Sequence, residues 1–153
     1  MEIWQYIEIL RRPNKTWFFS KDNTEEKINA LTKIASDGYP SLIYNLTEFL
    51  KDDNKEIRET TSNTITHLFK KIDSKKGYYD TLKHCSISKS DIDFYEANFP
   101  IEQYVELLAI SSLNGSGYIR EKAVKKLSQV DSPRAIQFLI YRLADWVLPV
   151  RQA

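Results

Sequence analysis

The feature that most constrains this sequence is a short motif that recurs at a fixed spacing. A β-branched residue is followed at once by arginine at Ile57-Arg58, Ile119-Arg120 and Val150-Arg151. Ile119 and Val150 are 31 residues apart, and Ile57 and Ile119 are 62 apart, which is twice 31. Recurrence at one period of about 20 to 50 residues is typical of stacked repeat architectures. The spacing therefore predicts a chain built from repeated structural units.

Each copy of the motif is preceded by an Asp or Asn residue and, further upstream, by a proline. The residue six positions before the arginine is Asp52, Asn114 or Asp145. The helix before it is opened by Pro40, Pro100 or Pro133. We predict that the six residues Asp52, Arg58, Asn114, Arg120, Asp145 and Arg151 cap the turn between two helices and form hydrogen bonds along the stack. The alternative is that carboxylate and guanidinium groups together bind a ligand phosphate.

The apolar residues recur at steps of three and four, which is the periodicity of amphipathic helices. The chain has only 4 Gly and 5 Pro to interrupt such helices. We expect one helix to start at Asn23, with Glu26 completing a capping box, and another to start after Asp53, with Glu56 in the same role. A third is expected to open at Pro40, since proline is tolerated in a first helical turn.

The second helix of each unit fits the pattern [IV]-R-x-x-[AT]-x-x-x-[LI]. The matching residues are Ile57, Arg58, Thr61 and Ile65, then Ile119, Arg120, Ala123 and Leu127, then Val150 and Arg151. This pattern is similar to the short HEAT-like repeats named for phycobilisome lyases, over residues 23–72 and 100–153. The resemblance implies an all-α fold, a right-handed α-solenoid of antiparallel helix pairs that bury their apolar faces against one another.

The expected organisation is a single solenoid domain over residues 1–153, or a fragment of a longer array. Residues 1–22 would form an N-terminal cap, with a helix in MEIWQYIEILRR and the aromatic cluster Trp17-Phe18-Phe19. Residues 23–72 would hold repeats, and residues 73–99 either a degenerate helix pair, near 78–84 and 90–98, or an insertion. Residues 100–153 would hold further repeats, of which the last is truncated.

If the chain is not a fragment of a longer array, its truncated last repeat predicts self-association at that end. Its first helix carries an apolar face of Ala135, Ile136, Leu139, Ile140 and Leu143. The seven residues VLPVRQA that follow are too few for a stable isolated helix, which needs about 12 to 15. A second copy or a partner would then cover this face.

Composition excludes several classes of function. The chain has 153 residues, with 22 Lys plus Arg against 21 Asp plus Glu, so no overall field favours nucleic acid or an anionic membrane. The single cysteine excludes an internal disulfide. No segment reaches 18 consecutive apolar residues, and the N-terminal stretch lacks the pattern of a signal peptide. We expect a cytoplasmic protein with no membrane segment.

No motif predicts a metal, a cofactor or catalysis. The sequence has no HExxH, no CxxC and no Gly-rich phosphate loop. His84 and Cys85 are adjacent, but neighbours in sequence usually point apart, so a nucleophile and base pair is not expected there.

The candidate partner-binding residues are those expected on the outward face of the second helices. In the first full copy they are Glu59, Asn63, His67 and Lys70, and in the second they are Glu121, Lys122, Lys125, Lys126 and Gln129. Lys122, Lys125 and Lys126 form the densest basic patch, which would recognise an acidic peptide or nucleic-acid phosphates. An ordinary solvated lysine face is the alternative.

These residues favour a protein-protein interaction scaffold or adaptor that uses the concave face of the solenoid. By the same resemblance, the alternatives are a nucleic-acid-binding protein of the DNA alkylation-repair glycosylase type and a bilin-lyase-like protein. The near-neutral charge argues against the glycosylase, and Asp145-Trp146 is only a dipeptide at a repeat turn. An inhibitor that wraps a toxin or an enzyme is a third class.

Overall fold

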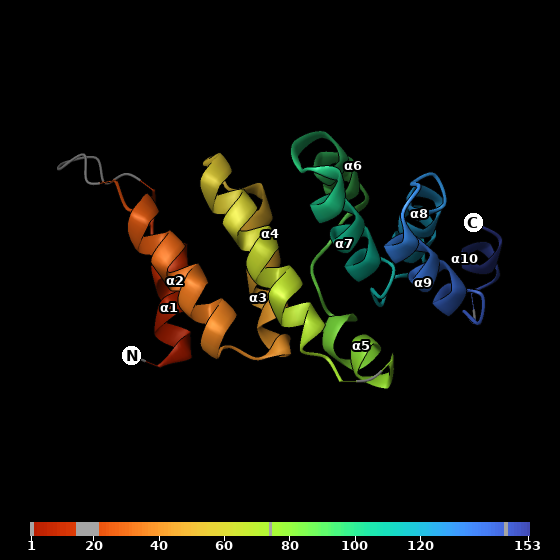
Figure 1. Ribbon diagram of the computed structural model, residues 1–153, viewed down its shortest axis with the longest axis horizontal. Helices are drawn as coiled ribbons and strands as arrows, with labels where there is room; N and C mark the ends of the chain where they lie inside the picture. Colours follow the sequence, from red (N-terminus) through yellow and green to blue (C-terminus); the bar gives the residue numbers. More distant parts are fainter. Residues whose placement is uncertain (1, 15–21, 74, 146) are drawn as a thin grey trace. The chain divides into compact units, whose positions relative to one another are not determined.

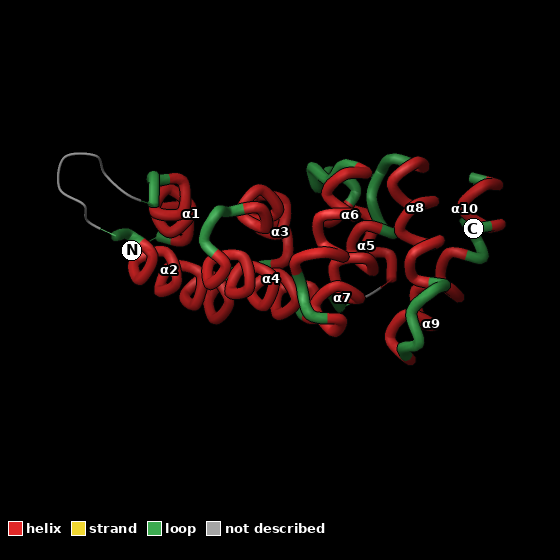
Figure 2. The backbone as a smooth tube through the Cα atoms, turned by 90° about the horizontal axis from the view of Figure 1, so that it is seen from above, coloured by secondary structure: helices red, strands yellow, loops and turns green. Residues whose placement is uncertain are grey.

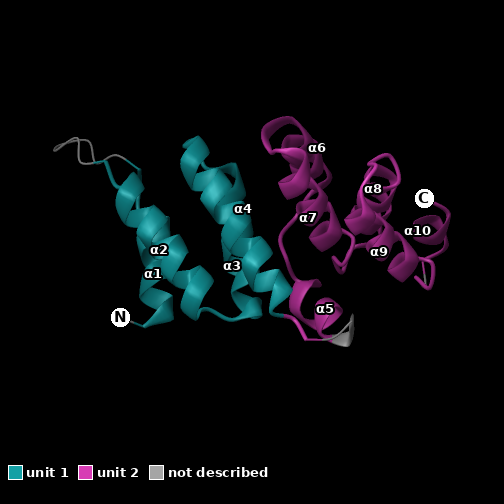
Figure 3. Ribbon diagram, in the orientation of Figure 1, with its two compact units in different colours: residues 1–71 teal, residues 72–153 magenta. Residues whose placement is uncertain are grey.

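The protein is all-helical and divides into two compact units, residues 1–71 and 72–153 (Figure 3). The computed structural model describes residues 2–14, 22–73, 75–145 and 147–153 (Figure 1). The boundary between the N-terminal unit and the C-terminal unit falls one residue before the end of the first set of predicted repeats. The predicted aromatic cluster Trp17-Phe18-Phe19 and the residue Trp146 lie outside the described residues.

The N-terminal unit consists of helix pairs in which successive second helices contact each other. Its helices are α1 (Ile3–Arg11), α2 (Thr24–Asp37), α3 (Ile43–Leu46) and α4 (Lys55–Lys70), with 3-10 turns Pro40–Leu42 and Thr47–Lys51 on either side of α3. Helix α1 packs on α2, α2 packs on α4, and the α3 segment packs on α4. In Figure 2, α1 and α3 form one row of this unit and α2 and α4 form the other. The expected N-terminal helix is confirmed.

The predicted start of α2 is correct, but its cap is made by different groups. Asn23 is the residue before the helix, yet its side chain accepts no hydrogen bond from the first turn. Instead its amide nitrogen donates to the carbonyl of Pro13 at 3.0 Å. The carboxylate of Asp22 accepts the Thr24 amide at 2.9 Å. The predicted capping box of Asn23 and Glu26 is therefore wrong, because Asn23 ties the helix start to the preceding chain.

The cap of α4 lies one residue later than predicted. Asn54, not Asp53, precedes the helix, and its side-chain oxygen accepts the amides of Glu56 and Ile57. Glu56 thus stands at the second helical position, too early to complete a capping box. Asp52 accepts the Asn54 amide at 2.9 Å and positions the new cap.

The C-terminal unit has six described helices, α5 to α10. Their bounds are α5 (Lys75–Leu82), α6 (Lys89–Asn98), α7 (Ile101–Ser111), α8 (Gly117–Leu127), α9 (Pro133–Arg142) and α10 (Leu148–Gln152). Helix α8 contacts both α6 and α10, and α7 contacts α9. Figure 2 accordingly shows α6, α8 and α10 in one row and α7 and α9 in the other.

Residues 73–99 contain two helices, α5 and α6, as the degenerate-pair alternative expected. Helix α6 takes the place of a second helix, since it contacts both α7 and α8. Its start is fixed by Ser88, whose hydroxyl accepts the Asp91 amide while Asp91 accepts the Ser88 amide at 2.8 Å, a reciprocal capping box. Helix α5 begins and ends slightly before the predicted range 78–84.

The apolar positions of the repeated motif form the core of both units. Ile57, Thr61 and Ile65 are fully buried in the N-terminal unit. Ile119, Ala123, Leu127 and Val150 are buried in the C-terminal unit. Since full burial of a Val, Leu or Ile side chain stabilises a fold by about 1.5 to 3 kcal/mol, this stripe accounts for a large part of the packing between helices.

The face of α9 predicted to be half covered is partly exposed. Ile136, Ile140 and Leu143 are 56%, 60% and 66% exposed, whereas Ala135 is buried and Leu139 is half-buried. The self-association that this face was expected to support stays a prediction. Among the described residues no helix combines the length and the apolar character needed to cross a membrane.

Candidate functional site

The repeated acidic or amide residue caps the turn between helices in all three copies. The side-chain oxygen of Asp52, Asn114 or Asp145 accepts the backbone amide two residues later, each at 2.9 Å. In two copies the arginine six positions on donates back to the two carbonyls at the start of the turn. Arg58 donates to the carbonyls of residues 52 and 53, and Arg120 to those of residues 114 and 115. Five of the six residues of the predicted capping set therefore form hydrogen bonds at these turns, namely Asp52, Arg58, Asn114, Arg120 and Asp145.

One arginine also reaches the next turn between helices, where it forms a buried cluster of charges. Arg120 donates through Nε to Asp145 Oδ2 at 2.9 Å and through Nη2 to Oδ1 at 3.3 Å. Arg142 donates to the same Oδ2 at 2.9 Å. Burial opposes the ionisation of Asp145, but hydrogen bonds from Arg120 and the Val147 amide outweigh it and lower the pKa of that carboxyl. Burial lowers the pKa of Arg142, and Asp145 acts in the opposite direction.

The N-terminal unit contains a counterpart that the sequence motif does not include. Lys27 stands 31 residues before Arg58, and like Arg58 and Arg120 it is the fourth residue of its helix. Its buried ammonium donates to Asn14 Oδ1 at 2.7 Å and lies 3.8 Å from Asp52 Oδ2 in the next turn. The 31-residue period leads to Lys27. The motif does not match there, because Glu26 stands where the other copies have a β-branched residue. Arg151, by contrast, is exposed.

Two lysines of the predicted basic patch on α8 form ion pairs with acidic residues of α6. Lys122 Nζ donates to Asp93 Oδ2 at 2.6 Å and to the Lys89 carbonyl at 2.8 Å. Lys126 Nζ donates to Glu96 Oε2 at 2.6 Å. The third lysine, Lys125, pairs along its own helix with Glu121 at 2.6 Å. Each lysine of the patch therefore has a carboxylate partner, and the surface is an array of ion pairs rather than a block of positive charge.

This surface of the C-terminal unit is called the α6–α8 face below. Its polar residues are Asp93, Glu96, Glu121, Lys122, Lys125, Lys126 and Gln129. The hydrogen bond from Lys125 lowers the pKa of Glu121, and slight desolvation acts in the opposite direction. In the N-terminal unit, the predicted residues Asn63, His67 and Lys70 are exposed on α4, and Glu59 is half-buried and lies 3.6 Å from Lys55.

A pocket of about 420 Å³ lies at one end of the α6–α8 face. It is bounded by the end of α6, the first turn of α7 and the end of α8, and its lining residues are Glu96, Phe99, Ile101, Tyr104, Lys126, Gln129 and Val130. Lys126 and Gln129 were predicted from the sequence. The others were missed, because only the packing of α6 and α7 against α8 brings them to this place. Ile101 is 54% exposed and lines this pocket together with the Lys126–Glu96 ion pair.

Tyr104 supplies the pocket with a hydroxyl that has no partner among the described residues. Its side chain is only 4% exposed, and its phenol oxygen is buried without a hydrogen bond. Burial, together with the charges of Glu96 and Asp93, raises the pKa of Tyr104 to about 12, so the group stays protonated at neutral pH. A buried hydroxyl without a hydrogen-bond partner lowers the stability of the fold by roughly 1 to 3 kcal/mol. An acceptor from a bound partner would recover part of that free energy.

The groups considered for catalysis do not converge. Cys85 is buried while His84 is exposed, so the two neighbours point apart. Burial raises the pKa of the Cys85 thiol to about 12, which keeps it as the unreactive thiol at neutral pH. Over the described part of the chain, no three His, Cys, Asp or Glu side chains gather in a group able to hold a metal ion.

Comparisons of this chain with protein-family models, with curated proteins and with solved structures found no match.

Proposed function

We propose that this chain is a protein-interaction module, a scaffold or adaptor without catalytic activity that binds a peptide segment of a partner on the α6–α8 face. The helix pairs would stack as a right-handed solenoid of HEAT-like repeats. Two features support that architecture. Second helices contact second helices within each unit, and the Asp or Asn turn with its cation recurs from Lys27–Asp52 to Arg120–Asp145. Stacked repeats present a continuous surface for partners.

The observation that carries the proposal is the pocket at the end of the α6–α8 face. It combines exposed Ile101, the Lys126–Glu96 ion pair and the unpaired hydroxyl of Tyr104. An apolar anchor with a few polar groups around it is the usual composition of a recognition pocket. A peptide would place an apolar side chain against Ile101 and a backbone carbonyl near Tyr104. Its charged side chains would pair with the lysines and carboxylates of the α6–α8 face.

Nucleic-acid binding is the weaker alternative, because the lysines that would contact phosphates already have carboxylate partners. Lys122 and Lys126 each lie 2.6 Å from an acidic side chain of α6. A phosphate would have to displace these carboxylates, and their negative charges would oppose it.

Selection of peptides from a random display library on the full chain tests the proposal. Selected peptides should bind, and Tyr104→Phe should weaken them by roughly three- to tenfold, which is the worth of one hydrogen bond. The same substitution should leave the melting temperature unchanged or higher, because it removes a buried hydroxyl that has no partner.

Ile140→Ser is the matched control, since Ile140 is an exposed residue of α9 outside this pocket. Peptides that bind the α6–α8 face should keep their affinity for this variant. The proposed face would be contradicted if no enriched peptide lost affinity with Tyr104→Phe while keeping it with Ile140→Ser.

A further inference from the structure

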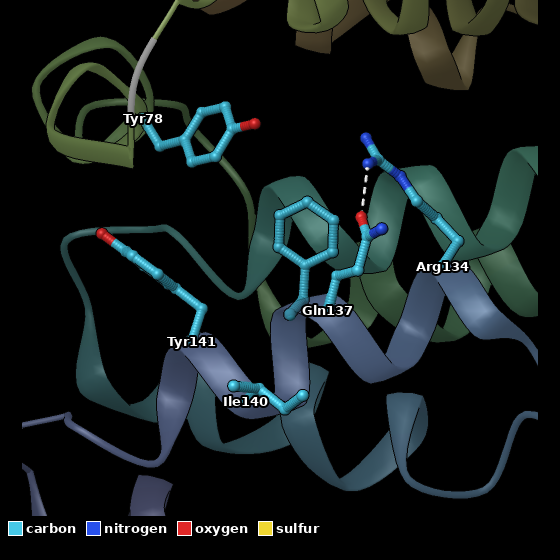
Figure 4. Close-up of a pocket in the computed structure, with 6 residues that line it drawn as sticks. Tyr78, Arg134, Gln137, Ile140 and Tyr141 are labelled. Carbon is cyan, nitrogen blue, oxygen red and sulfur yellow. Dashed lines mark hydrogen bonds between the residues drawn. The ribbon is translucent and has the colours of Figure 1, made fainter.

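A second pocket in the C-terminal unit, between α5 and α9, has a different chemical character from the α6–α8 face. Its volume is about 360 Å³, within the range of roughly 300 to 1,000 Å³ that is usual for ligand pockets. Its lining residues are Tyr78 of α5 and Arg134, Gln137, Phe138, Ile140 and Tyr141 of α9 (Figure 4). Of this set, Ile140 was singled out from the sequence, as part of the apolar face expected to be covered by a second copy or a partner. It is called the α5–α9 pocket here.

Three aromatic rings form the apolar wall of this pocket. The rings of Tyr78 and Phe138 have centroids 6.2 Å apart, and those of Tyr78 and Tyr141 are 6.5 Å apart in an edge-to-face arrangement. Figure 4 shows Tyr78 reaching from α5 toward the side chains of α9. A further aromatic ring would find edges and faces at the separations that aromatic pairs prefer. The wall therefore favours an aromatic occupant over an aliphatic one.

The polar wall is a guanidinium held in a fixed position. Arg134 pairs with Glu106 through Nε at 2.9 Å and Nη2 at 3.2 Å, and its Nη1 donates to Gln137 Oε1 at 3.0 Å (Figure 4). Since Gln137 accepts through its oxygen, its amide nitrogen remains to donate to a ligand. The Arg134 side chain is 32% exposed and that of Glu106 only 13%, so the cation is the more accessible partner.

Guanidinium groups over two of the rings disfavour a cationic ligand. The guanidinium carbon of Arg134 lies 4.9 Å from the centroid of Phe138, and that of Arg142 lies 4.2 Å from the centroid of Tyr141. The electron-rich faces that would attract a lysine or a quaternary ammonium already carry positive charge. With no carboxylate among the lining residues, the pocket favours a neutral or anionic group.

An exposed apolar stripe continues from the rim of the pocket. Ile140 lines the pocket, and Ile136 and Leu143 stand four residues before it and three after it, on the same side of α9. All three are more than half exposed. A free small molecule would fill only the pocket, whereas a chain segment would cover the pocket and the stripe together.

We propose that the α5–α9 pocket holds an aromatic side chain of a partner protein, with an acidic residue of that partner next to it. The aromatic ring would enter between Tyr78, Phe138 and Tyr141, and the carboxylate would lie near Arg134. Gln137 would donate its side-chain amide to a backbone carbonyl, and a following apolar residue would lie on the stripe. This site is independent of the α6–α8 face, and either can fail without the other.

Titration of the isotope-labelled full chain with three blocked tripeptides tests the proposal by amide chemical shifts. The probes are acetyl-Glu-Phe-Leu-amide, acetyl-Glu-Ala-Leu-amide and acetyl-Lys-Phe-Leu-amide. The first should shift the side-chain amide of Gln137 and bind about tenfold more tightly than the alanine probe, the usual worth of a buried aromatic anchor. It should also bind more tightly than the lysine probe, by a margin that shrinks as salt is added.

Matched substitutions locate the binding. Ile140→Ser should weaken the first probe by about tenfold or more. Ile101→Ser, the same change at an exposed residue of the α6–α8 face, should leave it unaltered. Equal affinity for the phenylalanine and alanine probes, or no effect of Ile140→Ser, would overturn the site. Phenylacetate binding as tightly as the first tripeptide would overturn the assignment to a protein partner.

Discussion

At the scale of single residues, the turn between helices depends on one oxygen atom and the charge on it. Asn114 and Asp145 accept the amide two residues later with the same length, 2.9 Å. A neutral amide is sufficient at position 114, where Arg120 donates to the backbone carbonyls of residues 114 and 115. At position 145 the carboxylate also lies between Arg120 and Arg142, so the negative charge has a role of its own.

Asp145→Asn separates these two roles, because it keeps the acceptor and removes the charge. The variant should lose about 3 kcal/mol of unfolding free energy at neutral pH, the lower end of what breaking a buried ion pair costs. Since the pKa of Asp145 is lowered in the folded state, its contribution is present above the unfolded pKa near 4 and is lost as the pH falls through the folded value.

Denaturant unfolding at several pH values measures the effect. The difference in unfolding free energy between wild type and Asp145→Asn should therefore decrease steadily below about pH 4. Asp131→Asn, at an exposed carboxylate of the same unit, is the control and should change stability little. Equal stability of Asp145→Asn and wild type at pH 7 would show that the charge stabilises nothing.

At the scale of helices, α6 and α8 are joined across their surfaces by paired charges. Asp93 and Glu96 are three residues apart on α6, and Lys122 and Lys126 are four apart on α8, so each set lies on one side of its helix. The two ion pairs that result connect residues 29 and 30 positions apart in the chain. They align α8 against α6 beside the pocket.

Charge reversal tests this alignment. Lys126→Glu should lower the denaturant midpoint by an amount equivalent to about 0.5 to 1 kcal/mol, because it places two carboxylates together at a partly exposed site. The double variant Lys126→Glu/Glu96→Lys should recover most of that loss. A double variant no more stable than Lys126→Glu alone would mean that the two side chains do not interact in solution.

The elements were predictable from sequence to the extent that they depend on local periodicity. The period placed the buried positions Ile57, Ile119 and Val150, and the prolines placed the first helices. The cap of α4 was misplaced by one residue because Asp53 and Asn54 are both good caps, and the choice depends on Asp52. The pockets were not predictable, since residues such as Ile101 and Tyr78 meet their neighbours only through helix packing that no local pattern encodes.

At the scale of the whole molecule, the same turn chemistry is used in both units. Lys27 reaches Asp52 in the N-terminal unit, and Arg120 reaches Asp145 in the C-terminal unit. Each unit buries its own stripe of motif residues. A fold built from repeated turns of this kind leaves the outward side chains of its second helices available to partners, and the proposed function rests on that property.

Hydrogen exchange of the full chain, free and saturated with a library-selected peptide, tests the proposed function most directly. The amides of Ile101 and Glu102, in the first turn of α7, have no acceptor within the helix and should exchange fast in the free protein. The bound peptide is predicted to slow exchange at these amides and at residues 126–130, and to leave α2 and α4 unchanged. Slowed exchange only in α2 and α4, or none anywhere, would contradict a binding site on the α6–α8 face.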